Sequence, residues 1–156
     1  MEPRTVLIVL VHLVLLVVAV RLVVIDVRTH RLPDRVVLPT LAVLLVLIAI
    51  DALVTADTAP LLRAGGGLLV LGGFYAALRL LSRDGMGGGD VKLAAAIGLL
   101  LGWHGWQPLA VGAASAFVLG AVHAAVLLLL RRADRHTRIA FGPWMIAGAV
   151  LGVLVA

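Results

Sequence analysis

The sequence contains no cysteine and few charged residues. Without cysteine, the chain has no disulfide framework, no zinc site built on thiolates and no thiol nucleophile. Only 13% of its 156 residues are charged and 63% are hydrophobic, so the polar surface is too small to cover a soluble domain of this length. Segments of alternating polarity, which a transmembrane β-barrel needs, are also lacking. These absences leave an all-α, polytopic membrane protein as the expected fold class.

Long apolar runs follow one another along the whole chain. A run of about 20 apolar residues is long enough to cross a bilayer as a helix. The fourth run is short for a full crossing, and Pro33 and Pro39 should prevent a helix from continuing through the connection between the first two. With no soluble domain or long linker in view, residues 1–156 are expected to form a single membrane-embedded domain. We expect about six transmembrane helices, over residues 5–25, 36–55, 62–81, 90–103, 108–130 and 139–156.

Small residues recur at helical spacing in the fourth and fifth expected helices. Membrane helices associate through small residues that let their backbones approach, so these faces are predicted to contact neighbouring helices. The residues are Ala94, Gly98 and Gly102 in the fourth helix, and Gly112, Ala116, Gly120 and Ala124 in the fifth.

The basic residues are distributed unevenly between the loops. All of the 13 lysines and arginines except Arg4 and Arg63 lie in or beside the connections after the first, third and fifth expected helices. Loops rich in Lys and Arg face the cytoplasm under the positive-inside rule. We therefore expect a multi-pass protein of the inner (plasma) membrane with both termini extracytoplasmic. The same rule accounts for the net charge of +5 without a nucleic-acid partner.

One acid enters the membrane directly after a glycine-rich segment. Asp90 follows Gly87, Gly88 and Gly89 and begins the fourth expected helix. An ionisable side chain in such a segment is costly and indicates a functional site. Glycines allow another chain to approach closely, so Gly87 and Gly89 are predicted to admit a substrate backbone beside Asp90. The alternative is that Asp90 caps the helix and the glycines form a flexible turn.

A second acid, Asp26, ends the first expected helix. With six crossings, Asp26 and Asp90 fall at the same, cytoplasmic end of the protein. Two adjacent carboxyl groups do not ionise together easily and can share one proton. The ionised acid can then activate a water, while the protonated acid polarises a peptide carbonyl and later protonates the leaving amine. This aspartic protease chemistry requires no metal and no other cofactor.

Three motifs resemble those of the type IV prepilin peptidases, in the same order along the chain. The first is Asp26 followed by Leu32-Pro33-Asp34, and the second is Gly87-Gly88-Gly89-Asp90 with Val91-Lys92-Leu93 after it, which resembles a GxGD motif. The third is Phe141-Gly142-Pro143 at the start of the last expected helix. The resemblance covers essentially the whole chain, and its two aspartates fall on Asp26 and Asp90.

The resemblance implies a membrane aspartic endopeptidase that removes a short basic leader from type IV prepilins or pseudopilins at the cytoplasmic membrane face. The implied partners are the prepilin substrate and the lipid bilayer, and the oligomeric state is left open. Larger members of the family carry a cytoplasmic region with paired cysteines and also N-methylate the new terminus. Since this sequence lacks that region, it resembles the compact peptidase-only members, and methylation is not expected.

The residues around the two acids allow more than one role. Asp34 either supports the acid pair or forms a turn before the second helix. Lys92 either tunes the pair or extends to the lipid headgroups. Phe141, Gly142 and Pro143 are expected to shape the start of the last helix.

Two functions without catalysis compete with the peptidase. A small transporter or channel component would use the acids to bind protons or cations, and a noncatalytic assembly subunit would use only the small-residue faces. A transport site is expected near the middle of the membrane. Both acids here are predicted at one membrane face, which favours the peptidase.

Overall fold

The computed structural model describes residues 3–81, 86–131 and 140–156, and these form six α-helices. The all-α prediction is confirmed. In chain order the helices are α1 (Pro3–Thr29), α2 (Asp34–Thr55), α3 (Ala59–Leu81), α4 (Gly88–His104), α5 (Trp106–Leu129) and α6 (Gly142–Leu154).

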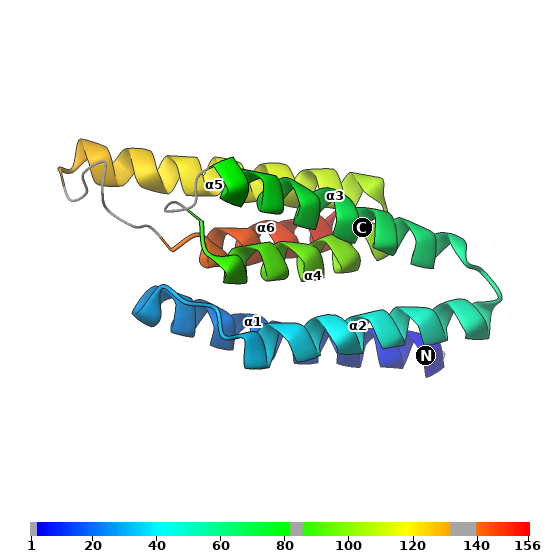
Figure 1. The fold of residues 1–156 in the computed structure, drawn as a ribbon. Helices are drawn as coiled ribbons and strands as arrows, with labels where there is room; N and C mark the ends of the chain where they lie inside the picture. The colour runs from blue at the N-terminus through cyan, green and yellow to red at the C-terminus, as the bar shows by residue number, and fades with distance from the viewer. Residues whose placement is uncertain (1–2, 82–85, 132–139) are drawn as a thin grey trace.

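Successive helices run in alternating directions along a common bundle axis (Figure 1). Helices α1 and α2 form one layer, and α3, α4, α5 and α6 form a thicker one beside it. The end of α1 and the beginnings of α4 and α6 meet at one end of the bundle, whereas both chain termini lie toward the other end. This alternation brings together the segments that carry the two acids. That both termini lie outside the cytoplasm stays a prediction from the distribution of Lys and Arg.

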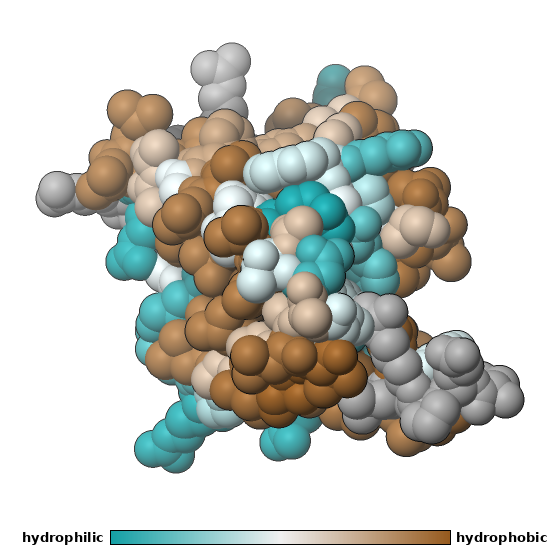
Figure 2. Space-filling view, turned by 90° about the vertical axis from the view of Figure 1, so that its right-hand side faces the viewer, coloured by the Kyte–Doolittle hydropathy of each residue, from teal (hydrophilic) through white to brown (hydrophobic). Residues whose placement is uncertain are grey.

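The outer faces of the helices are strongly apolar. Val17 on α1 is 70% exposed and Leu129 on α5 is 82% exposed, which suits contact with lipid rather than water. Four helices, α1, α2, α3 and α5, are long and apolar enough to cross a membrane. Helices α4 and α6 are shorter, with 17 and 13 residues. Seen from the end that holds the termini, apolar side chains occupy much of the rim and a group of polar residues lies near the middle (Figure 2).

Helix α4 is the centre of the thicker layer, and its small residues let α3 approach closely. Side chains on several of its turns are fully buried, including Ala94, Leu99 and Leu101. A Cβ on Gly98 would overlap the carbonyl oxygen of Gly67 on α3, and a Cβ on Gly67 would overlap that of Gly98. The predicted packing role of Ala94, Gly98 and Gly102 is therefore confirmed.

Helices α5 and α6 interlock in the same way. A Cβ on Gly148 would lie against the backbone of Gly112 and Ala116, and a Cβ on Gly120 would lie 2.6 Å from the ring of Phe141. The predicted face of α5 is thus confirmed at Gly112, Ala116 and Gly120. Helices α1 and α2 pack against the layer that these two interlocked pairs form.

Two predicted helix boundaries were wrong near the acids. Helix α1 continues beyond residue 25 to Thr29, because the first helix-breaking residue of the connection is Pro33. Its end is marked by His30, whose φ of 50° is left-handed. Asp26 therefore lies inside the last turns of α1 rather than after it.

The expectation from the prolines is borne out, and the second correction concerns glycine. No single helix continues through the connection between α1 and α2, and Pro39 lies within α2, inside the helix expected over residues 36–55. Gly88 and Gly89, predicted to lie in a loop, are the first two residues of α4. The expected basic residues Arg83, Arg132, Arg135 and Arg138 lie outside the described residues.

Candidate active site

Asp26 is the buried acid of the site. It projects from the last turns of α1 and is only 4% exposed. Its Oδ2 accepts a hydrogen bond from the backbone N–H of Gly142, at 3.1 Å. Gly142 is the first residue of α6, where unpaired N–H groups and the helix dipole favour a negative charge. The beginning of α6 therefore orients the Asp26 carboxylate and stabilises its ionised form.

The third sequence motif explains why this contact forms. A Cβ on Gly142 would lie 2.5 Å from Asp26 Oδ2, so the carboxylate fits only against a glycine. Next to it, the ring of Phe141 packs on the rings of Phe117 and Tyr75, with centroid separations of 5.6 and 6.1 Å. Pro143 follows in the first turn, where its missing N–H is not needed. Phe141 thus anchors the start of α6, and Gly142 presents its N–H to the acid.

Asp90 is the second acid and lies in the first turn of α4. It is the third residue of the helix, so it is not itself the cap: Gly87 holds that position. The Gly87 N–H donates a hydrogen bond to Asp90 Oδ2 at 3.0 Å. This bond restrains the Asp90 side chain at the start of α4. Asp90 is partly buried, in contrast to Asp26.

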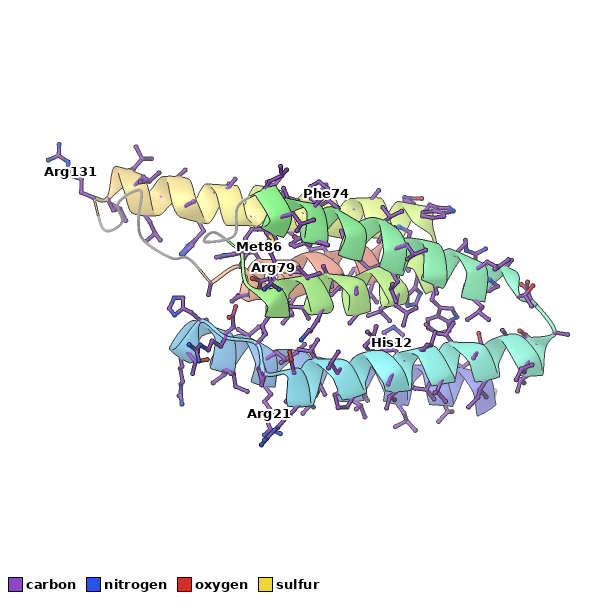
Figure 3. All side chains as sticks on the ribbon, viewed as in Figure 1. His12, Arg21, Phe74, Arg79, Met86 and Arg131 are labelled. Carbon is purple, nitrogen blue, oxygen red and sulfur yellow. The ribbon has the colours of Figure 1, made fainter. Side chains whose placement is uncertain are left out.

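The two acids come together at one end of the bundle. Their carboxyl groups lie near enough for their charges to interact directly, although 64 positions separate them in the sequence. Tyr75 of α3 is also within electrostatic range of Asp90 and is 1% exposed. Figure 3 shows Arg79 and Met86 beside the beginning of α4, at the end of the bundle that holds the acids. The arrangement provides two carboxyl groups of unequal burial, each held through one oxygen by a backbone N–H.

The glycines before Asp90 contact parts of the protein itself. A Cβ on Gly88 would overlap the guanidinium of Arg79, and a Cβ on Gly89 would lie 2.7 Å from Leu32 Cβ. Gly89 therefore allows the connection between α1 and α2 to approach the start of α4. Gly87 is exposed. Among the three glycines, Gly87 is the one best placed to meet an incoming chain.

The motif residues Asp34 and Lys92 pair with each other. Lys92 Nζ lies 2.5 Å from Asp34 Oδ2, and the two side chains are 37% and 56% exposed. The pair joins the first turn of α2 to the first turn of α4. Pro33 caps α2, and its carbonyl accepts the N–H groups of Val36 and Val37. The ion pair of Lys92 with Asp34 and the cap at Pro33 thus lie at the two helix ends next to the acids.

Comparison with known protein families matches residues 13–130 to the type IV leader peptidase family. The matched region covers most of the chain and includes both acids. The chain belongs to the type IV leader peptidase family. The match ends before Phe141, so the contact between Gly142 and Asp26 is an observation from the structure alone.

Curated relatives of this family resemble most of the chain. A protein named prepilin leader peptidase/N-methyltransferase from Stutzerimonas stutzeri is 38% identical over 128 residues, covering 81% of this chain and 43% of that protein. A protein of the same name from Escherichia coli (strain K12) is 35% identical over 130 residues, covering 83% of this chain and 56% of the relative. The chain thus spans about half the length of these relatives. No solved structure shows a significant match.

Sequence reasoning missed two residues near the acids of this leader peptidase family member. Gly142 was expected only to shape the last helix, and its bond to Asp26 crosses 116 positions of sequence. Tyr75 was not predicted as a site residue. Its hydroxyl, within an otherwise apolar run, is the one sequence feature that could have indicated it. Within the described residues, no three His, Asp or Glu side chains are grouped as a metal site would require.

Proposed function

We propose that this chain is a membrane aspartic endopeptidase that removes the leader from type IV prepilins or pseudopilins. Its membership of the leader peptidase family and the name of its relatives support this substrate class. The observation that carries the proposal is the meeting of Asp26 and Asp90 at one end of the bundle. Two carboxyl groups within electrostatic range are the essential parts of an aspartic protease site.

In the proposed reaction, the acid pair shares one proton. The ionised acid removes a proton from water, and the resulting nucleophile attacks the scissile carbonyl. The protonated acid donates a hydrogen bond to that carbonyl oxygen and later protonates the leaving amine. In both acids the backbone N–H engages Oδ2, which leaves Oδ1 to take the water or the substrate carbonyl. The Gly142 and Gly87 N–H groups act here as positioning groups.

The proposed location of the reaction is the cytoplasmic face of the inner membrane. The described lysines and arginines support it, because Arg28, Arg31, Arg35 and Lys92 all belong to the helix ends and connections around the acids. Such clusters favour the cytoplasmic side. The prepilin leader would therefore meet the acids from the cytoplasm, with the rest of the substrate in the bilayer.

The decisive experiment removes one carboxylate at a time. Asp26→Asn and Asp90→Asn keep the size of the side chain and are expected to abolish cleavage of a co-expressed prepilin. Asp57→Asn is the matched control: Asp57 lies in the turn between α2 and α3, at the opposite end of the bundle, where it accepts the N–H of Ala59. The precursor and the mature protein are separated on a gel, and insertion is checked by membrane fractionation. Full processing by either single variant would refute the acid pair.

A transporter or channel is the alternative function. It would place its acids near the middle of the membrane. Here Asp26 lies in the last turns of α1 and Asp90 in the first turn of α4, so both lie at helix ends, which supports the peptidase. The name of the relatives also includes N-methyltransferase, but the acid pair accounts for peptide hydrolysis only.

A further inference from the structure

An apolar groove runs along the inner face of α1. It has a volume of about 590 Å³ and lies between α1 on one side and α4 and α6 on the other, with α2 contributing Thr40 and Leu44. Along α1 its lining extends from Ile8 to Leu22, which corresponds to about 21 Å of helix. Most of the lining is aliphatic. The groove therefore has the length and polarity to receive one face of a hydrophobic helix of about four turns.

The groove is aligned with the two acids. Leu22, at its end on α1, lies one turn before Asp26 on the same helix face. Leu93, at its end on α4, likewise lies about one turn after Asp90. On α6, Ile146 lies one turn after Gly142, the residue that holds Asp26. All three elements of the site thus continue directly into the walls of the groove.

The other end of the groove carries its main polar contact. His12 of α1 points toward α4 (Figure 3), and its Nε2 lies 3.1 Å from Nε2 of His104. His12 Nδ1 is bonded to the carbonyl oxygen of Ile8 at 2.8 Å, so Nδ1 carries the proton and Nε2 accepts from His104. This pair links α1 to α4 at the end far from the acids. It leaves the wall between the pair and the acids apolar.

We propose that this groove binds the hydrophobic helix of the substrate and thereby delivers the scissile bond to Asp26 and Asp90. The inference rests on the proposed function. A lipid acyl chain would also suit an apolar wall, but it gives no reason for the groove to be continuous with the acid pair on three helices. A substrate whose leader meets the acids while the rest of it lies in the bilayer, as the proposed function has it, requires that continuity.

The geometry also sets the distance between the docked helix and the cut. Leu22 and Leu93 are the lining residues of α1 and α4 nearest the acids, and each lies about one helical turn from its acid. One turn corresponds to about 5 Å. An extended chain crosses that distance in about two residues. The substrate segment next to the cut is therefore extended, and its helix begins about two residues beyond the scissile bond.

Filling the groove tests the proposal. Ala19 of α1 lines it and is half-buried, whereas Val17 on the same helix is 70% exposed. Ala19→Phe is compared with the control Val17→Phe on two substrates: a full-length prepilin and a peptide that contains the leader and the cleavage site without the apolar helix. For Ala19→Phe, the ratio of kcat/KM for prepilin to that for peptide should fall at least about tenfold. For Val17→Phe the ratio should equal that of the wild type.

The outcomes separate the two proposals. If the wild type cuts neither substrate, the proposed peptidase function fails. If it cuts both and the ratio is unchanged in Ala19→Phe, only the groove proposal is overturned.

A photocrosslinking residue provides a second measurement that does not depend on cleavage of the peptide. Placed at position 19 of the Asp90→Asn variant, it should form an adduct with the apolar helix of bound prepilin, and at position 17 it should not. Suppose that prepilin co-purifies with the variant but the adducts at position 19 contain only lipid or a second copy of this chain. That result would overturn the groove proposal.

Discussion

The contact between Gly142 and Asp26 makes one substitution unusually informative. Gly142→Ala adds a single methyl group, which would lie 2.5 Å from Asp26 Oδ2. The backbone itself accepts alanine, because among the described glycines only Gly105 has a positive φ. Relief therefore requires the carboxylate to rotate or α6 to move, and either change breaks the 3.1 Å hydrogen bond.

The size of the effect follows from that bond. A hydrogen bond to a charged group contributes about 1.5–3 kcal/mol. If this hydrogen bond holds the Asp26 carboxylate in its reactive position, its loss should lower kcat/KM by about 10- to 150-fold. The bond positions a group that reacts with bound substrate, so kcat should fall more than KM rises.

The assay follows cleavage of a purified prepilin in detergent or in liposomes, over a range of substrate concentrations. Gly73→Ala is the matched control: Gly73 lies inside α3, whereas Gly142 begins α6, and a Cβ on Gly73 meets nothing within 4 Å. The control should cleave at the wild-type rate and should be at least as stable, since alanine is the better helix former. A folded Gly142→Ala enzyme with wild-type kcat would refute the positioning role of this contact.

Two further predictions concern the supports of the site. Lys92→Met and Asp34→Asn each remove an ion pair whose members are 37% and 56% exposed. The free energy of unfolding should therefore change by less than about 1 kcal/mol, and the rate of cleavage should change little. If Lys92→Met alone lost as much activity as Asp90→Asn, Lys92 would instead take part in the reaction. Gly98→Val forces α3 and α4 apart, because even a Cβ at this position overlaps the backbone of Gly67. Its melting temperature should fall well below that of Gly73→Val, and equal melting temperatures would contradict the interlocking of these helices.

The sequence by itself determined the class of the protein and predicted that its two acids lie together. Apolar runs of membrane-crossing length predict helices wherever they occur, because a bilayer leaves the backbone no other way to satisfy its polar groups. Alternation of the helices then places the end of the first and the beginning of the fourth on one side. For this reason the sequence alone assigns Asp26 and Asp90 to the same end of the bundle.

Only the tertiary structure decided how the acids are held. The bond from Gly142 to Asp26 and the pair of Lys92 with Asp34 join residues 116 and 58 positions apart. Such contacts depend on the depth and rotation of each helix, and these follow from how Gly67 and Gly98 and their counterparts on α5 and α6 interlock rather than from any local pattern. The groove beside α1 is likewise a product of packing, since it is the space left where four helices do not close on one another.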